Sequence, residues 1–201
     1  MGALFLYPGE NILPHHGEAF YYSELYDSTE KEILFESLVN GIVWKQEPIK
    51  LFGKEVMQPR LTAWYGDPGV SYSYSGITMQ PHTWNAELGY VKQRVEELAG
   101  ITFNSALLNL YRNGNDGMGW HRDNERELGK NPIIASVSFG AERKFQLRTY
   151  SKKADLKSIC LANGSCLIMR GETQHYWEHR VPKISTETKP RLNITFRKVA
   201  Q

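Results

Sequence analysis

The triplet His121-Arg122-Asp123 has the residue types and the spacing to bind a metal ion. In an extended segment alternate side chains share a face, so His121 and Asp123 point the same way and Arg122 points away. His179, far downstream, can supply a third ligand. Two imidazoles and one carboxylate leave an open face on non-haem iron(II), where a cosubstrate and dioxygen can bind together. The chain has six histidines, and a single H-x-D triplet also occurs on protein surfaces by chance, so this pattern alone leaves a surface interpretation open.

A second group of candidate residues lies in the last apolar stretch, which reads PRLNITFRK from Pro190 to Lys198. Apolar and polar residues alternate there, which predicts a strand with Arg191 and Arg197 on one face, their Cα atoms roughly 20 Å apart. Arginine binds a carboxylate through two parallel hydrogen bonds, so two such cations suit a dicarboxylate such as 2-oxoglutarate. The alternative is an edge strand whose polar side faces solvent.

These motifs, in this order, resemble the AlkB family of oxidative dealkylases. The resemblance includes three further stretches: NLY from Asn109 to Tyr111, the loop GNDGMGWHRDNERELG and the strand PIIASVSFGAERKF. Between Leu51 and Gly76 the chain is similar to the duplex-acting DNA-repair AlkB homologues of eukaryotes, with LFGK, PR, YGDPG and YSYSG in that order. The similarity covers roughly residues 48 to 199. One departure is Asn124, where those duplex-acting homologues carry Asp.

The resemblance implies a role for each matching residue. His121, Asp123 and His179 would hold iron(II), which 2-oxoglutarate would chelate through its 2-keto and C1-carboxylate oxygens. Arg191 would bind the far carboxylate of the cosubstrate, and Arg197 would lie near the metal, close to Asp123. The other implied cosubstrate-binding residues are Asn109, Tyr111 and Asn193. The implied substrate-binding residues are Phe52 as an aromatic finger that enters the duplex, Tyr72, Tyr74 and Ser75 in the pocket wall, Glu125 facing the target base, and Arg60.

The chemistry that the resemblance implies is oxidative demethylation of DNA bases such as 1-methyladenine and 3-methylcytosine. Dioxygen would oxidise 2-oxoglutarate to succinate and CO2, and the hydroxylated N-methyl group would leave as formaldehyde. Such methylated bases are cations, which an aromatic wall and a carboxylate favour over neutral bases. Three alternatives remain: the same chemistry on RNA, a non-catalytic nucleic-acid-binding module, and an oxygenase acting on protein or a small molecule. A binding module would need neither the triad nor the two arginines.

Two amphipathic helices are predicted in the N-terminal half, upstream of these motifs. The first runs from Glu30 to Leu38, with Thr29 and Glu32 as a capping-box pair and Ile33, Leu34 and Leu38 on the apolar face. The second runs from Asn85 to Leu98 and ends at Gly100, which suits a left-handed stop. Its predicted apolar side consists of Trp84, Leu88, Val91, Val95 and Leu98.

After Gly100 the pattern changes to short strands rich in β-branched and aromatic residues, separated by Gly, Asn or Pro. Strands at this spacing indicate a sandwich or jelly roll. We therefore expect a mainly β or α+β fold: a double-stranded β-helix core with the N-terminal helices packed on one face. The predicted strands are 101–112, 135–139, 143–150, 158–162, 165–169, 175–181 and 191–199.

The length of 201 residues, with 41% hydrophobic residues, predicts one domain with one sizeable core. Within it we expect an acidic N-terminal extension at 1–47, nucleotide-recognition hairpins at 48–82 and the jelly-roll core at 100–199.

The net charge of +2 hides an uneven distribution of charge along the chain. Residues 141–201 carry thirteen Lys and Arg against five Asp and Glu, whereas residues 1–48 carry two against eight. A basic half is expected for a polyanionic partner, although charged surface alone also explains it.

The sequence contains no apolar run long enough to span a bilayer, and its start lacks the features of a signal peptide. Cys160 and Cys166 form no disulfide framework and are expected to pack as small apolar groups in a reducing compartment. We expect a monomer in the cytoplasm, or in the nucleus of a eukaryote. Its expected partner is alkylated DNA, double- or single-stranded, with RNA as the alternative and no membrane.

Overall fold

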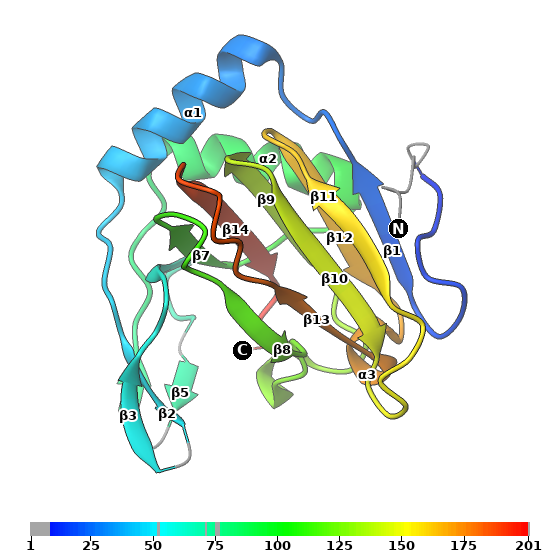
Figure 1. Cartoon of the computed structure of the whole chain (residues 1–201). Helices are drawn as coiled ribbons and strands as arrows, with labels where there is room; N and C mark the ends of the chain where they lie inside the picture. The colour runs from blue at the N-terminus through cyan, green and yellow to red at the C-terminus, as the bar shows by residue number, and fades with distance from the viewer. Residues whose placement is uncertain (1–8, 52, 71, 75–76, 201) are drawn as a thin grey trace.

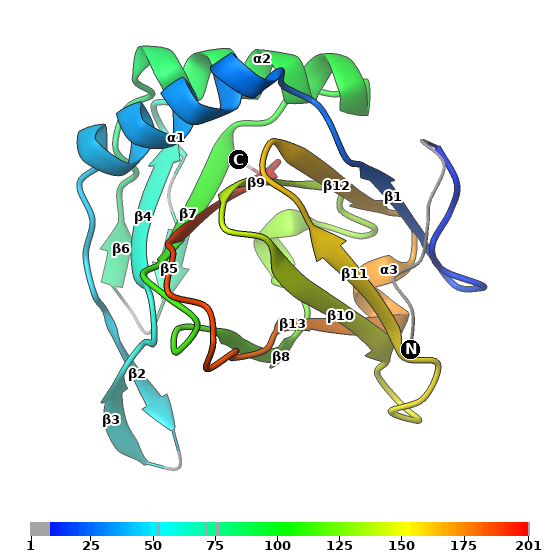
Figure 2. The same ribbon diagram turned by 45° about the horizontal axis from the view of Figure 1, so that its top comes forward.

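Two β-sheets lie face to face, and two helices cover the outer side of the larger sheet (Figures 1 and 2). The computed structural model describes residues 9–51, 53–70, 72–74 and 77–200. The larger sheet, called the major sheet here, has six strands. In spatial order they are β1 (Glu18–Tyr22), β12 (Ser165–Arg170), β9 (Ile134–Gly140), β14 (Arg191–Arg197), β7 (Ser105–Tyr111) and β4 (Leu61–Gly66).

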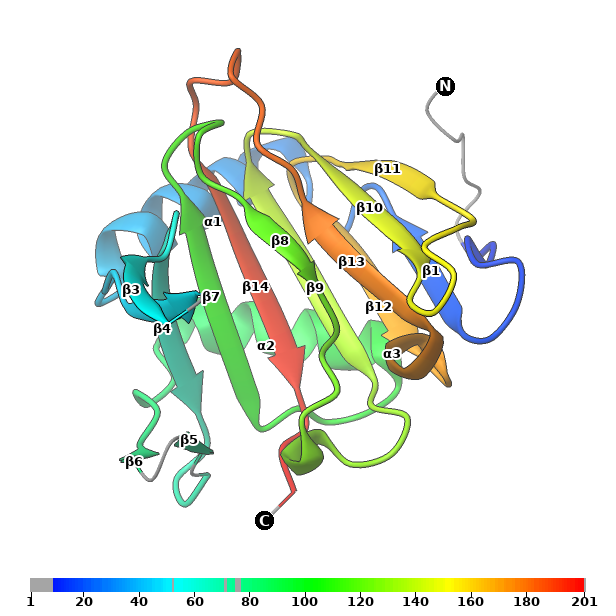
Figure 3. The ribbon, with the colours of Figure 1, turned by 60° about the horizontal axis from the view of Figure 1, so that its bottom comes forward.

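The smaller sheet, called the minor sheet, has four strands, and Figure 3 shows it in front of the major sheet. In spatial order they are β11 (Lys157–Leu161), β10 (Arg143–Thr149), β13 (Trp177–Val181) and β8 (Met118–His121). Two antiparallel hairpins stand beside the sandwich: β2 (Pro48–Leu51) with β3 (Lys54–Met57), and β5 (Tyr72–Tyr74) with β6 (Ile77–Met79). The predicted jelly-roll core with N-terminal helices on one face is confirmed.

The N-terminal helix α1 (Ser28–Gly41) is capped differently from the prediction. Its N-cap is Asp27, whose side chain accepts from the backbone N–H groups of Thr29 and Glu30. The Glu30 carboxylate accepts in return from the backbone N–H of Asp27, which completes a capping box. The predicted pair of Thr29 and Glu32 was wrong, because the Thr29 N–H already lies inside the first turn and is itself capped.

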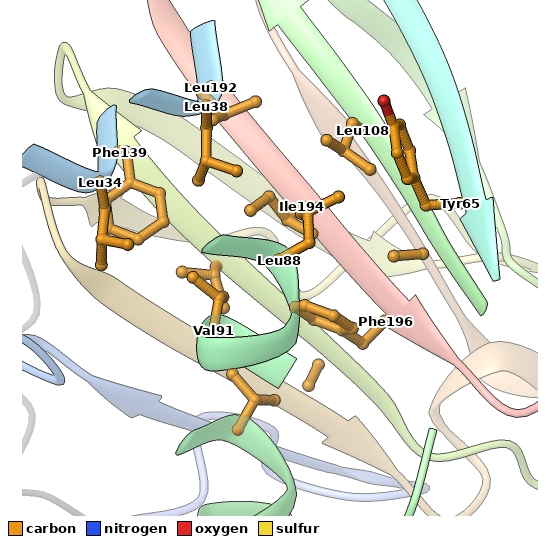
Figure 4. Close-up of a cluster of buried hydrophobic side chains, with 14 of the residues drawn as sticks. Leu34, Leu38, Tyr65, Leu88, Val91, Leu108, Phe139, Leu192, Ile194 and Phe196 are labelled. Atoms are coloured by element: carbon orange, nitrogen blue, oxygen red, sulfur yellow. The ribbon is translucent and has the colours of Figure 1, made fainter. Parts of the chain in front are cut away.

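Both helices pack on the major sheet through one face, shown in Figure 4. In α1 this face holds Leu34 and Leu38, whereas Ile33, predicted to belong to it, is 59% exposed. Helix α2 (Ala86–Ala99) agrees with its prediction: Asn85 caps it, its buried residues are Leu88, Val91 and Val95, and it ends at Gly100 with φ 70°. A positive φ is cheap for glycine, which has no Cβ.

Strand β14 lies between β9 and β7 in the middle of the major sheet, so it is not an edge strand. Its apolar side chains, Leu192, Ile194 and Phe196, are fully buried against the helices. Its polar side chains face the space between the two sheets, where Arg191 is 1% exposed and Asn193 7%. Both sides of the strand are therefore buried, and the solvent-facing alternative for the polar side is excluded.

Several strand boundaries differ from the prediction. The strand predicted from Ile101 begins at Ser105, because residues 101–104 lead out of α2 without pairing in a sheet. The strand predicted from His175 begins at Trp177, because Thr173–Tyr176 form one helical turn, α3. The major sheet also includes β1 and β4, which lie outside the stretch 100–199 expected to form the core.

Both cysteines are free; Cys166 is buried and Cys160 is half-buried. None of the described helices has the length and apolar character needed to cross a bilayer.

Candidate functional site

The predicted metal ligands come together between the two sheets. His121 is the last residue of β8, and it pairs across the minor sheet with His179 of β13. Asp123 follows two residues after β8. Its carboxylate oxygens lie 4.0 Å from Nε2 of His121 and 4.0 Å from Nε2 of His179. One ligand atom from each of the three residues lies within 4.8 Å of the others, so a single ion can bind all three.

Hydrogen bonds orient these ligands. His121 Nδ1 contacts the Gly119 carbonyl oxygen at 2.9 Å, which directs Nε2 toward the other ligands. Asp123 Oδ1 accepts from Arg197 Nη2 at 2.8 Å, and the Asp123 backbone N–H donates to Gln174 Oε1 at 2.9 Å. Gln174 is fully buried, and sequence reasoning missed it because a glutamine in α3 has no recognisable spacing from the H-x-D triplet.

Burial and neighbouring charges give the ligands the protonation states that a metal needs. Burial, together with His121 and Arg197, lowers the pKa of His179 to about 3, so its imidazole is neutral. Burial alone would raise the pKa of Asp123, but the positive charge of the Arg197 guanidinium outweighs that effect and holds it below its ordinary value. A neutral imidazole and an ionised carboxylate are the forms that coordinate a cation. The donor set of two imidazoles and one carboxylate fits non-haem iron(II).

Arg191 lies in the same interior with part of its guanidinium unpaired. Its Nη2 donates to Ser138 Oγ at 2.8 Å, while Nε and Nη1 have no hydrogen-bond partner among the described residues. The guanidinium also lies over the Tyr111 ring at 5.2 Å. Burial lowers the pKa of Arg191 to about 10, so the group stays charged at neutral pH. A buried cation with free donors is destabilised unless an anion pairs with it, and a carboxylate matches its planar fork.

A cavity between the sheets, called the inner cavity here, connects Arg191 to the metal ligands. Besides the triad and Arg191, it is lined by Asn109, Tyr111, Asn193 and Arg197, all predicted to bind the cosubstrate. Arg191 and Arg197 therefore lie toward different parts of one cavity, with Arg197 bonded to Asp123. Asn193 is held by hydrogen bonds to Ser136 Oγ and the Val137 carbonyl oxygen. The arrangement can take a small dicarboxylate that reaches from Arg191 to the metal.

A second cavity of about 310 Å³, the outer cavity, adjoins the inner one and shares Leu107 and Arg197 with it. Glu125 lines it, and its Oε2 is buried without a hydrogen-bond partner in the described part of the chain. Arg60 also lines it, and its Nε donates to Asn109 Oδ1 of the inner cavity at 2.7 Å. Sequence reasoning did not single out Trp64, Gln80, His82 and Glu47, which complete much of its wall.

The structure does not describe the side chains of four predicted substrate-binding residues. Phe52 and Ser75 lie outside the described residues. Tyr72 and Tyr74 lie on β5, and their side chains are likewise outside the described part of the chain. Asn124 is exposed and lines neither cavity, so the departure from the duplex-acting homologues lies beside the site.

Comparison with known proteins agrees with the fold and the family that the sequence motifs predicted. The family model of the 2OG-Fe(II) oxygenase superfamily matches residues 18–197. The chain is 44% identical to human "Alpha-ketoglutarate-dependent dioxygenase alkB homolog 3", over 89% of this chain and 65% of that protein. It is 38% identical to mouse "DNA oxidative demethylase ALKBH2", over 89% of this chain and 79% of that protein.

The chain thus spans less than two thirds of the length of the human alkB homolog 3. The solved structure of OsALKBH1 has the same fold, with a TM-score of 0.66 at 18% identity, covering 97% of this chain and all of that one. The matched segment contains the complete His121, Asp123 and His179 triad and the buried Arg191. The chain therefore belongs to the AlkB family of the 2OG-Fe(II) oxygenase superfamily, whose members use iron(II) and 2-oxoglutarate.

Proposed function

We propose that this chain is an iron(II)- and 2-oxoglutarate-dependent demethylase of DNA bases of the 1-methyladenine and 3-methylcytosine type. The observation that carries the proposal is the unpaired, buried carboxylate oxygen of Glu125 in the cavity next to the metal ligands. Methylation on the Watson–Crick edge makes such bases cationic, and a buried carboxylate without a partner favours a cation over a neutral base. The mouse relative is named a DNA oxidative demethylase, which supports the same substrate class.

In this proposal the polar residues predicted to bind iron(II) and 2-oxoglutarate have defined roles in the inner cavity. His121, Asp123 and His179 hold iron(II), which together with 2-oxoglutarate and dioxygen supplies the hydroxylation of a C–H bond. Arg191 binds the far carboxylate of 2-oxoglutarate through its free donors. Arg197 keeps the Asp123 carboxylate ionised and oriented. The remaining proposed cosubstrate contacts are Asn109, Tyr111 and Asn193.

The outer cavity would hold the methylated base. Trp64 provides an aromatic surface in its wall, held by a hydrogen bond from Nε1 to Ser105 Oγ at 2.8 Å. An aromatic face and a carboxylate together stabilise a cationic ring. Arg60, bonded to Asn109, ties this wall to the inner cavity and so links the position of the base to the position of the cosubstrate. Contacts from Tyr72, Tyr74 and Ser75 are proposed on the family resemblance alone.

A base inside a duplex must leave the stack before it can enter this cavity. We propose that Phe52, between β2 and β3 in the sequence, fills the gap that the flipped base leaves. Phe52→Ala should then slow demethylation of double-stranded DNA more than of single-stranded DNA, because a single strand has no partner stack to fill. The effect is measured as the ratio of demethylation rates on matched single- and double-stranded 1-methyladenine oligonucleotides. An unchanged ratio of the two rates would refute the finger role.

The experiment that tests the proposed function is mass spectrometry of methylated oligonucleotides after incubation with the protein, iron(II) and 2-oxoglutarate. Single- and double-stranded DNA and RNA are compared side by side. Loss of the methyl group from DNA, with formation of succinate, is the expected result. His179→Ala should abolish it, whereas His175→Ala, at an exposed position of α3, should keep it. Demethylation of RNA alone would replace the proposal with the RNA alternative, and no demethylation of any substrate would contradict both.

The proposed oligomeric state and cellular location follow from the same function. The protein is proposed to act on DNA as a monomer. A DNA substrate and two free thiols agree with the predicted reducing setting, the cytoplasm or, in a eukaryote, the nucleus.

A further inference from the structure

The outer face of the minor sheet, turned away from the metal ligands, gathers positive charge. Alternate residues of β10 and β13 point outward there, and no described helix or strand covers this side in Figure 3. We call this surface the basic face. Its cations are Arg122, Lys144, Arg148, Lys153 and Arg180, and its aromatic rings are Trp120 and Tyr150.

Four of the five cations of the basic face are held by stacking on its rings. Over the Trp120 ring lie Arg148 Cζ at 4.0 Å and Arg180 Cζ at 4.5 Å from the centroid. Over the Tyr150 ring lie Arg122 Cζ at 3.7 Å and Lys153 Nζ at 4.3 Å. Stacking on an aromatic face orients a guanidinium while leaving N–H donors at its rim. Arginines positioned in this way lose less conformational entropy when an anion binds.

One carboxylate lies among the described strand positions of this face, and it is already neutralised. Glu178 Oε1 accepts from Arg148 Nε at 2.6 Å and from Lys153 Nζ at 2.9 Å, and its side chain is only 6% exposed. Glu142, in the loop before β10, is a second carboxylate beside this face, where it interacts with the Cys160 thiol next to Lys144. Five cations against two carboxylates leave an excess of three positive charges on the basic face. Four of the thirteen Lys and Arg of residues 141–201 are therefore collected on one sheet surface.

The basic face lies on the other side of the minor sheet from the metal ligands, and it includes residues adjacent to His121. Trp120 and Arg122 flank the ligand His121 in sequence, and β8 is the edge strand of the minor sheet. Glu125 of the outer cavity follows β8 by a few residues. A polymer with one residue in the outer cavity can therefore pass over this edge and reach the basic face. Tethering at the cavity raises the effective concentration of the rest of the polymer at that surface.

We propose that the basic face binds the phosphodiester backbone of the DNA strand whose methylated base occupies the outer cavity. This inference rests on the proposed function and adds a second, sequence-independent contact surface to it. Phosphate contacts of this kind position a nucleic acid and make binding depend on salt, because each contact releases bound counterions.

The experiment compares two double variants that lose the same charge. Lys144→Gln with Arg180→Gln changes the basic face and leaves the partners of the buried Glu178 intact. Lys31→Gln with Lys92→Gln changes α1 and α2, on the opposite side of the molecule in Figure 2. Binding of a labelled DNA oligonucleotide is measured by fluorescence anisotropy at several NaCl concentrations, and the melting temperature of each variant is recorded.

The logarithm of the DNA association constant is plotted against the logarithm of the NaCl concentration. The slope of this plot should become shallower by about 1.4–1.8 for the basic-face variant, at roughly 0.7–0.9 for each lost phosphate contact. The helix variant should keep the wild-type slope. Equal slopes in both variants, whatever their melting temperatures, would show that the stacked cations only support the sheet and would overturn the proposal. Lys144→Gln alone, at an exposed position of β10, should remove one contact and provides the test if the double variant does not fold.

The wild type is assayed for demethylation in parallel. Demethylation of DNA with equal slopes refutes this inference alone. A shallower slope without demethylation of any oligonucleotide supports the basic face and refutes the proposed function.

Discussion

Arg191 has an environment that a surface arginine lacks: it is 1% exposed, keeps its charge, and leaves two nitrogens without a partner among the described residues. Arg191→Ala should weaken 2-oxoglutarate binding by about 2–5 kcal/mol, since the carboxylate of the ligand would be buried without its partner. Arg191→Lys should weaken it less, because lysine keeps the charge without the planar fork. Calorimetric titration of the protein with 2-oxoglutarate in the presence of Mn(II) measures both.

Arg170→Ala is the control for this titration, because Arg170 is largely exposed and pairs with Glu18 at the end of β12. It should bind 2-oxoglutarate like the wild type. The same affinity in all three variants would remove Arg191 from the cosubstrate site.

Gln174 supports the metal site from outside the triad. Its Oε1 accepts from the backbone N–H of Asp123, and both residues are buried. Gln174→Met keeps the volume of the side chain but leaves that N–H unsatisfied. Metal affinity should fall about 10- to 100-fold, the usual effect of losing a partner of a metal ligand. The affinity is measured by titration with Co(II), whose visible absorption reports binding.

Gln93→Met, at an exposed position of α2, serves as the matched control and should bind Co(II) like the wild type. If Gln174→Met lowers the melting temperature but binds Co(II) with unchanged affinity, Gln174 has only a packing role.

At the scale of secondary-structure elements, α1 depends on its first turn. Asp27 accepts from two backbone N–H groups at the N-terminus of α1. Asp27→Ala should therefore reduce the free energy of unfolding by about 1 kcal/mol. Thr29→Ala should change it little, because no side-chain hydrogen bond of Thr29 caps the helix. Urea denaturation of the two variants gives both values, and a larger loss for Thr29→Ala would contradict this capping assignment.

Strand β14 shows why the site needs a central strand rather than an edge. Leu192, Ile194 and Phe196 hold it against the helices, so its other face is rigidly presented to the minor sheet. Arg191 and Asn193 on that face thereby keep their positions relative to His179, which lies on the facing sheet. A strand at the edge of the sheet would lack one of the two neighbours, β9 and β7, that hold this register.

At the scale of the whole molecule, the two sheets contribute different halves of the site. His121 and His179 belong to the minor sheet, whereas Arg191 and Asn193 belong to the major sheet. A cosubstrate bound to both would link the sheets, so Mn(II) and 2-oxoglutarate should stabilise the folded protein. Each ligand at 100 times its Kd contributes about 2.7 kcal/mol. For a domain of this size that corresponds to a rise in Tm of roughly 5–10 °C per ligand.

Thermal denaturation with and without the two ligands measures this stabilisation. The His179→Ala variant should show no rise with Mn(II). A rise in that variant equal to the wild-type rise would place the metal elsewhere.

Local sequence patterns determined much of this protein. Helix α2 was predicted from Asn85 to Leu98 with its stop at Gly100, because helical periodicity and glycine conformation depend on residues close in sequence. The pleat placed His121 and Asp123 on one side of the chain and Arg122 on the other, and Arg122 does stack on the outer Tyr150. The order and spacing of the motifs were enough to recognise the family.

Tertiary structure alone decided which surfaces are interior. Alternation in β14 could not distinguish an exposed polar face from one buried against a second sheet, because both have the same period. The partners of Asp123, Gln174 and Arg197, lie 51 and 74 positions away in sequence, so no local pattern connects them. The outer cavity draws its wall from β4, β7 and the segment after β8. Contacts between segments distant in sequence depend on how the sheets pack, and that packing is a property of the whole chain.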